Sequence, residues 1–432
     1  MSIKLAKVRL WGTDIAVISW NQSGQFADFQ YTPEFIAFGI EVAPLTMPVR
    51  KEPYRFTALS FETFKGLPGM LADVLPDKYG NAIIDQWLIK EKRSPDSFNP
   101  VERLCYIGTR AMGALEFSPT TSPTELGNSQ EPIEIEKIVN LVNKVMNSKN
   151  YELTTAELGT EEMAHILQVG TSAGGARAKA IINWNQNTGV IVAGHKKPTK
   201  GFDSWLIKFD GINENSDKEL ADPKGFSRIE YAYHLLATRV GINMSKCRLL
   251  EEGGRAHFMT KRYDRINGEK IHKSSLCGIG HYDFNMRNGT SYEQLIVAGQ
   301  ELQLNKSEIE QLFLRMVFNV VFRNQDDHTK NTEFLMDRNG VWRLSPAFDI
   351  TYSYNPKGDW TSTHQMTING KNTDFELEDL LQVGKLAGIS KHKSKTIINT
   401  VLTAKQDWPE LAKIAEINPI IIKSISRDFR RF

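Results

Sequence analysis

Two polar side chains, Asp326 and Asn331, stand five positions apart in the segment FRNQDDHTKNTEFLMDRNGVWRLSPAFDI. A further carboxylate, Asp349, follows at the end of an apolar, strand-like stretch. The same offset between an aspartate and an asparagine occurs in loops that catalyse phosphoryl transfer. In such loops one carboxylate accepts the proton of an attacking hydroxyl, while an amide oxygen and a second carboxylate hold Mg²⁺ against the phosphates. The segment therefore suits phosphoryl transfer.

His328 follows Asp326 here, whereas in the ordinary protein-kinase loop the histidine precedes the aspartate. The order Asp-x-His-x-x-Asn is nearer to that of lipid-type and other atypical kinases. Two other interpretations stay open: a capped surface loop, and a metallohydrolase site in which Asp326, Asp327, His328 and Asp349 bind a metal. The metallohydrolase is disfavoured because no HxH or HxxxH pair accompanies the cluster.

A glycine-rich segment, VGTSAGGARAKA, lies between two predicted strands at 169–180. The glycines of this segment are Gly170, Gly174 and Gly175. They permit tight backbone curvature and let backbone N–H groups approach an anion. It lacks the Lys-Ser/Thr pair of a Walker A loop and the GxGxxG spacing of a dinucleotide site. A glycine hairpin without a ligand is equally consistent, although the neighbouring Arg177 and Lys179 favour phosphate.

Lys208 lies in the middle of the apolar stretch SWLIKFDG. A charged group at such a position must be paired with an opposite charge or have a role in the function. Glu230, on the amphipathic helix predicted at 226–242, is a candidate partner. A lysine held by a helix glutamate and reaching nucleotide phosphates is the arrangement of protein kinases. The alternative is a lysine on an edge strand whose ammonium reaches water.

These groups must be positioned by a chain that alternates between β and α patterns. Residues 1–60 alternate apolar and polar side chains, which predicts strands, and the pattern turns helical at 67–92. We expect a β-rich domain over 1–117 and a Ser/Thr/Pro-rich linker over 118–132. A sheet-containing lobe with the glycine loop, Lys208 and Glu230 is predicted over 133–265, and a helical lobe over 266–432.

Composition excludes several classes. The chain of 432 residues has 53 Lys and Arg against 51 Asp and Glu, a net charge of +2, which argues against nucleic-acid binding as its main role. Its basic runs at 391–395 and 427–431 are expected to be solvated faces. The three cysteines, Cys105, Cys247 and Cys277, lie far apart in the sequence. Together with the lack of a secretory signal and of an apolar run near ~18 residues, this predicts a cytoplasmic protein without a membrane span.

Taken in order, the motifs resemble the HipA-type serine/threonine kinase toxins of bacterial toxin–antitoxin systems. LPDKYGNA and RAMGALEF are similar to the N-terminal subdomain of that family. GTSAGGARAKA, WLIKFD, RIEYAYHLLA, KRYDR, DDHTKN and PAFDI follow in the order of its kinase core. The resemblance covers nearly the whole chain. It implies an α+β, kinase-like bilobal fold, with an antiparallel β N-lobe, an all-α C-lobe and an N-terminal β-rich subdomain.

The resemblance also implies roles for individual residues. Asp326 is similar to the catalytic base, with His328 at the family's loop histidine, and Asn331 and Asp349 are similar to the Mg²⁺ ligands. The remaining ATP-binding positions are Ser172, Gly174, Gly175, Lys208, Lys261 and Tyr263. Among them, Lys208 is similar to the phosphate-binding lysine, and Lys261 and Tyr263 fall where an interlobe strand meets the adenine.

Ser172 occupies the position that family members autophosphorylate, with Thr171 as the alternative acceptor. The family's targets include an aminoacyl-tRNA synthetase, and its partner is a small helix-turn-helix antitoxin, HipB-like, that binds operator DNA.

Two features, GGARAK in place of AGAQEK and Lys261 in place of an acidic residue, indicate a sister branch of the family. The competing functions are a small-molecule or lipid kinase and a catalytically idle co-repressor held on DNA by the antitoxin.

Overall fold

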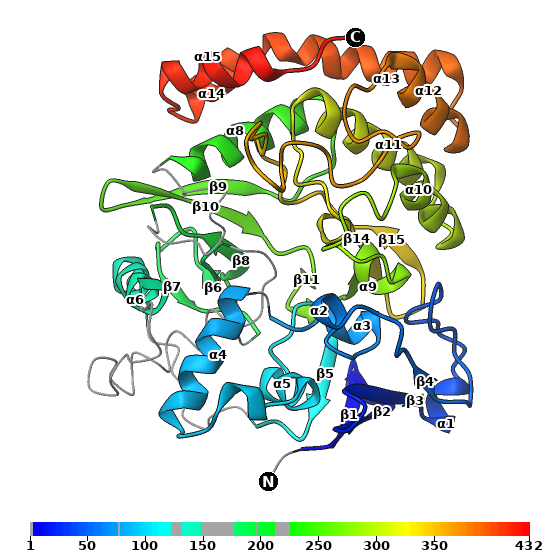
Figure 1. Ribbon diagram of the computed structural model, residues 1–432. Helices are drawn as coiled ribbons and strands as arrows, with labels where there is room; N and C mark the ends of the chain where they lie inside the picture. The colour runs from blue at the N-terminus through cyan, green and yellow to red at the C-terminus, as the bar shows by residue number, and fades with distance from the viewer. Residues whose placement is uncertain (1–2, 77, 122–131, 148–176, 196, 212–224) are drawn as a thin grey trace. The chain divides into compact units, whose positions relative to one another are not determined.

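The structure, a computed structural model, divides the chain into two compact units (Figure 1). It describes residues 3–76, 78–121, 132–147, 177–195, 197–211 and 225–432. The first unit consists of Met1–Val42, Val49–Lys224 and Leu250–Lys273. The second consists of Ala43–Pro48, Gly225–Leu249 and Ser274–Phe432. The glycine loop, with Ser172, Gly174 and Gly175, lies outside the described residues.

The first unit begins with a five-stranded antiparallel sheet of order β4-β3-β2-β1-β5. Alternate side chains of its first strand are buried, as the apolar–polar alternation predicted. Its strands are β1 (Leu5–Leu10), β2 (Thr13–Asn21), β3 (Phe26–Tyr31), β4 (Tyr54–Arg55) and β5 (Leu115–Ser118). The short helices of this region are α1 (Pro33–Ile36), α2 (Phe61–Phe64), α3 (Gly69–Ala72) and η1 (Pro95–Ser97).

A second five-stranded sheet has the order β7-β6-β8-β10-β9, and the boundary between the units falls inside β9. Its strands are β6 (Lys179–Trp184), β7 (Ile191–Ala193), β8 (Asp203–Lys208), β9 (Cys247–Glu252) and β10 (Arg255–Lys261), and the ribbon β11 (Arg265–Ile266) with β12 (Glu269–Lys270) follows. Helices α4 (Lys78–Lys90), α5 (Pro100–Ile107) and α6 (Ile135–Asn147) belong to this unit. Side chains of α4, α5, α6 and the sheet share one core, so this sheet is covered by helices from both sides of the predicted linker (Figure 1).

A buried charge cluster joins two distant segments of the first unit. The Asp264 carboxylate accepts from Arg262 Nε at 2.8 Å, from Arg265 Nη1 at 2.8 Å and from the Gly113 backbone N–H at 2.7 Å. Arg265 also donates to the carbonyl of Ala111. Burial alone would raise the pKa of Asp264, but the two guanidiniums hold it well below its usual range. Two motifs of the resemblance, RAMG and KRYDR, thus form one structural site.

The second unit is mainly helical and supplies the acidic segment. Its helices are α8 (Phe226–Arg239), α9 (Leu276–Gly280), α10 (Tyr292–Glu301), α11 (Lys306–Val321), α12 (Leu377–Leu386), α13 (Lys391–Thr403), α14 (Trp408–Ile414) and α15 (Pro419–Asp428), with the single turns η2 (Thr329–Asn331) and η3 (Ala404–Gln406). A three-stranded sheet contains β13 (His272–Ser275), β14 (Glu333–Met336) and β15 (Trp342–Leu344). No helix of the described residues is long and apolar enough to cross a membrane.

Helix α11 is the support of the acidic segment. It begins with a capping box in which Asn305 and Glu308 satisfy each other's backbone N–H groups. Its C-terminal Phe322 packs against Tyr233 of α8, whose hydroxyl donates to the Phe322 carbonyl at 2.7 Å. The following residue, Arg323, has a φ of +57°, which ends the helix and turns the chain into the loop. The loop therefore starts from a rigid, buried base.

We expect Asp264→Asn to lower the free energy of unfolding by about 3–5 kcal/mol, because it leaves two largely buried guanidiniums without their carboxylate. The measurement is urea denaturation followed by circular dichroism. Asp14→Asn is the matched control, since Asp14 also pairs with two cations, Lys7 and Arg9, but at the surface. That variant should leave the midpoint nearly unchanged. Equal effects of the two substitutions would contradict the role given to the buried cluster.

Candidate active site

The carboxylate of Asp326 is held in place and remains accessible. It lies in the acidic loop, residues 323–331, between α11 and β14. Trp360 Nε1 donates to Asp326 Oδ1 at 2.8 Å, and the Asp326 N–H donates to Ser353 Oγ at 3.3 Å. The side chain is nevertheless 42% exposed. An oriented carboxylate that a substrate hydroxyl can reach is what a general base requires.

Asn331 is tied to the same residue from the other end of the loop. Its Nδ2 donates to the Asp326 carbonyl at 2.7 Å, and its N–H donates to the His328 carbonyl at 2.9 Å. The single turn η2 therefore converts the five-residue offset into a fixed geometry. Because the NH₂ group is used in this bond, the amide oxygen Oδ1 is the atom that remains for an outside ligand.

His328 stabilises the turn and also approaches the base. It is the N-cap of η2, and its Nδ1 accepts from the Lys330 N–H at 3.3 Å. Its Nε2 lies 3.7 Å from Asp326 Oδ1, and its ring packs on Phe284 at 5.6 Å. His328 is thus a local cap whose second nitrogen faces the Asp326 carboxylate.

Asp349 lies on a segment that runs beside the acidic loop. At one end of this segment the Ser345 N–H donates to the Glu333 carbonyl at 3.0 Å, and at the other the Ser353 N–H donates to the Arg323 carbonyl at 3.2 Å. Asp349 itself has a φ of +52°, a left-handed conformation that is uncommon for residues other than glycine. Strained backbone of this kind is frequent at functional sites.

The donor set of these residues fits Mg²⁺. Asn331 offers an amide oxygen and Asp349 a carboxylate, and hard oxygen ligands of this type are the ones that Mg²⁺ prefers. A site of this kind keeps several water ligands and takes others from substrate phosphates. The fit therefore depends on few protein ligands, and both are present on adjoining segments.

Asp327 is buried, whereas its neighbour Asp326 is partly exposed. Its carboxylate is fully buried and accepts from Tyr292 Oη at 2.7 Å, from His364 Nδ1 at 2.7 Å and from the Gln365 N–H at 2.8 Å. His364 must carry its proton on Nδ1, because a carboxylate only accepts. Burial would raise the pKa of Asp327, but His364 and the other donors outweigh it and lower the pKa.

This network disfavours the metallohydrolase interpretation. Both oxygens of Asp327 are used inside the protein, so Asp327 cannot join Asp326 and His328 as a metal ligand. In the part of the chain that the structure describes, no group of three or more His, Cys, Asp and Glu side chains is arranged to hold a metal.

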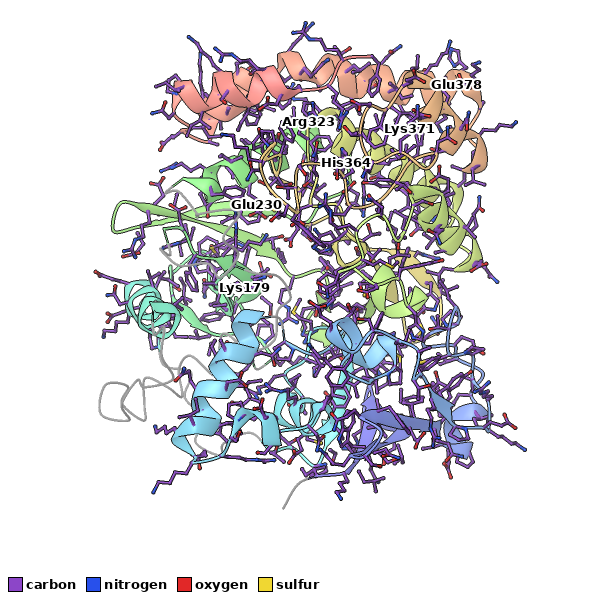
Figure 2. The ribbon with its side chains drawn as sticks, viewed as in Figure 1. Lys179, Glu230, Arg323, His364, Lys371 and Glu378 are labelled. Carbon is purple, nitrogen blue, oxygen red and sulfur yellow. The ribbon has the colours of Figure 1, made fainter. Side chains whose placement is uncertain are left out.

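Lys208 lies in the first unit, on a central strand. It is 6% exposed and stands opposite Lys179 of β6 and Phe258 of β10, with its Nζ 5.7 Å from the Phe258 ring. The alternative of an edge-strand lysine reaching water is therefore wrong. Lys179 is also buried, and Figure 2 shows it within the sheet. Glu230, the predicted partner of Lys208, is buried on α8 in the second unit.

Lys261 and Tyr263 lie at the end of β10 and just beyond it. Lys261 Nζ donates to Asp203 Oδ1 at 2.8 Å, and both side chains of this pair are about two-fifths exposed. The Arg262 N–H between them donates to the Ser204 carbonyl at 2.9 Å. The contact of this strand with adenine stays a prediction, as do the roles of Ser172, Gly174 and Gly175.

Sequence reasoning missed the residues that orient the two aspartates. Trp360 and Ser353 hold Asp326, while Tyr292 and His364 hold Asp327, and these partners are 27 to 37 positions away in the chain. Figure 2 shows His364 in the loop-rich part of the second unit. No motif marks these residues, because their roles depend on long-range contacts.

We expect Asp327→Asn to destabilise the protein by about 3 kcal/mol at pH 7, because three buried donors lose a charged acceptor. Asp326→Asn is the matched control: an amide oxygen can still accept from Trp360, so its cost should be below about 0.5 kcal/mol. The lowered pKa of Asp327 means that its contribution is complete above about pH 4 and is lost as the pH falls further. Thermal unfolding should therefore show a difference between wild type and Asp327→Asn that shrinks from pH 7 to pH 3. A difference independent of pH would contradict a charged Asp327.

Known proteins resemble the chain over both of its parts. Residues 6–118 match the HipA N-terminal domain, and residues 171–408 match the HipA-like C-terminal domain. No curated protein matches the sequence.

One solved structure is similar over almost the full length. HipA of Shewanella oneidensis MR-1, solved in a complex with HipB and its operator DNA, gives a TM-score of 0.64 at 16% identity over 98% of this chain and 95% of that chain. The Helicobacter pylori proinflammatory kinase CtkA gives a TM-score of only 0.32 at 13% identity, over 52% of this chain and 86% of that one. The first similarity confirms the expected α+β fold class. The expectation of an all-α C-lobe is wrong in one respect, because residues 266–432 contain the sheet of β13, β14 and β15. Because the C-terminal model alone matches more than half of the sequence, this chain belongs to the HipA family.

Proposed function

We propose that the protein is an ATP- and Mg²⁺-dependent kinase that phosphorylates Ser or Thr of a protein substrate. The observation that supports this most is the arrangement around Asp326. One accessible carboxylate is oriented by Trp360, and the amide of Asn331 is fixed against its backbone. This is the arrangement that phosphoryl transfer to a hydroxyl needs, since the chemistry depends on positioning and charge.

Each residue of the site has a defined task in this proposal. Asp326 accepts the proton of the substrate hydroxyl as the oxygen attacks the γ-phosphorus. Asn331 Oδ1 and the Asp349 carboxylate would hold Mg²⁺, and Lys208 would contact the phosphates. Bound ATP would supply the γ-phosphoryl group, with ADP leaving as the bond from the γ-phosphorus to the bridging oxygen breaks, and Mg²⁺ would offset the negative charge. The buried contacts of Asp327 keep the loop in position without taking part in the transfer.

We further propose that a partner controls this activity. A small helix-turn-helix antitoxin, HipB-like, would neutralise the kinase and connect it to operator DNA. The Shewanella HipA was solved with HipB and operator DNA, which supports this choice. The net charge of +2 favours DNA contact through the partner. The target in this proposal is a translation-related protein, with an aminoacyl-tRNA synthetase as the first candidate.

Autophosphorylation of Ser172 would be a second control. A phosphate adds about −1.5 to −2 charge, which would repel the phosphates of ATP from the glycine loop. The chain would then switch itself off without its partner.

We expect the purified protein to gain one phosphate, about 80 Da, when it is incubated with ATP and Mg²⁺. Intact-mass spectrometry measures the gain, and peptide mapping should place it at Ser172. Asp326→Asn should show no gain although it remains folded. ATP binding without a gain would favour a small-molecule or lipid acceptor. If the protein neither binds ATP nor gains mass, the kinase proposal is contradicted and the idle co-repressor is favoured.

We expect Lys208→Met to lower kcat/KM for ATP by about 100-fold or more, because a buried cation near the phosphates is lost. Lys197→Met is the matched control. It removes the same group in the first unit from an exposed pair with Glu269 that has no part in the proposed site. Steady-state kinetics should find less than about a threefold change for this control. Equal losses in both variants would contradict the phosphate role of Lys208.

A further inference from the structure

One residue at the end of α15 is bonded to both segments that carry the proposed catalytic groups. The backbone carbonyl of Asp428 accepts from Arg323 Nε at 2.6 Å. Its side-chain Oδ2 accepts from the hydroxyl of Tyr352 at 2.6 Å. Arg323 begins the acidic loop, and Tyr352 lies on the segment of Asp349. Asp428 therefore bridges the two segments from one position.

The two attachment points are equally close to the functional side chains. Arg323 precedes Asp326 by three residues, and Tyr352 follows Asp349 by three residues. Each of these spans is too short to absorb a large shift at its anchored end. A displacement at Asp428 would therefore be passed to the proposed base and to the proposed Mg²⁺ ligand together.

Backbone conformation shows why such an anchor is needed. Arg323 has a φ of +57° and Asp349 a φ of +52°, so both segments contain a non-glycine residue in the left-handed region. Such residues are conformationally strained and persist where the surroundings hold them. One bond of Asp428 is to strained Arg323 itself, and the other is to Tyr352, three positions after strained Asp349.

The segment that follows α15 is itself firmly seated. The Arg430 N–H donates to the Val321 carbonyl at 3.0 Å, and its carbonyl accepts from Lys405 Nζ at 3.1 Å. The Arg430 guanidinium lies over the Phe375 ring at 5.1 Å, and burial lowers its pKa to about 10. The expectation that the basic run 427–431 is entirely a solvated face is therefore wrong for Arg430.

The hydroxyl of Tyr352 is suited to a permanent bond. Burial, together with its hydrogen bond to Asp428, raises the pKa of Tyr352 well above its usual value. The hydroxyl therefore stays protonated and donates to the carboxylate at any physiological pH. Bonds from a neutral donor to a charged acceptor are stronger than bonds between neutral groups.

We propose that Asp428 is a positioning residue, which holds the Asp326 loop and the Asp349 segment in register through Arg323 and Tyr352. This rests on the function proposed above for Asp326 and Asp349. Asp428 touches no reacting atom in this proposal. It acts by limiting the relative movement of a base and a metal ligand, and a shift near 1 Å at such groups can cost up to about 100-fold in rate.

The test compares two tyrosines of one segment. Tyr352→Phe removes only the hydroxyl that bonds Asp428. Tyr354→Phe is the matched control, because the Tyr354 ring, which stacks on Arg323 at 4.5 Å, is kept. We expect Tyr352→Phe to lower kcat about tenfold and to raise the Mg²⁺ concentration for half-maximal rate, with KM for the protein substrate unchanged. The control should match wild type.

Two substitutions at Asp428 test the same bond from its other side. Asp428→Ala should reproduce Tyr352→Phe, and the double variant should be no worse than either single one, because both remove one interaction. Asp428→Asn should restore most of the rate, since its amide oxygen still accepts from Tyr352. A merely structural role for Asp428 would predict additive losses and no selective effect on the Mg²⁺ requirement.

Hydrogen exchange separates this proposal from the kinase proposal, because it does not need activity. In Tyr352→Phe and in Asp428→Ala, amides of both 323–331 and 349–353 should exchange about tenfold faster than in wild type or in Tyr354→Phe. Unchanged exchange in the acidic loop would overturn the bridge, whatever the activity. Faster exchange with an unchanged kcat and Mg²⁺ requirement would also overturn it. If wild type transfers no phosphate, the kinase proposal fails, and the exchange result still decides whether Asp428 holds the two segments.

Discussion

The buried carboxylate of Asp327 is the interaction on which the site depends. Its three donors come from α10 and from the long loop between β15 and α12, so it joins elements that are far apart in the chain. A buried charge is tolerated only when it is fully bonded, and here the bonds also define which way the acidic loop faces. Asp327 is thereby held inside the protein, while the adjacent Asp326 remains 42% exposed to solvent.

The first unit uses the same principle for a different purpose. Asp264 holds two arginines and a backbone N–H in one buried cluster, which connects the segment of Gly113 to the end of β10. The N-terminal subdomain is thereby fixed to the strand that carries Lys261. In the kinase proposal this strand approaches the adenine, so the cluster would stabilise the nucleotide-binding edge as well as the fold.

Polar contacts of this kind also hold each of the proposed catalytic groups in position. Asn331 is fixed by a local turn, Asp326 by a tryptophan and a serine from another loop, and the Asp349 segment by the residue that ends α15. Local turns form from neighbouring residues, whereas the other contacts need the complete second unit. The positions of these side chains relative to one another therefore depend on the folding of the whole second unit.

Local sequence patterns were enough to predict the α+β class, the residue types of the acidic loop and the resemblance to the HipA family that the comparisons confirm. Strand alternation, helix periodicity and the offset of Asp326 and Asn331 are local patterns, and local patterns follow from backbone geometry. Long-range packing, which no local pattern shows, buries Asp327 and not Asp326, places Lys208 on a central strand and brings Arg430 over the Phe375 ring. Those outcomes depend on contacts with residues tens of positions away, and the spacing of residues in the sequence does not predict which distant groups come into contact.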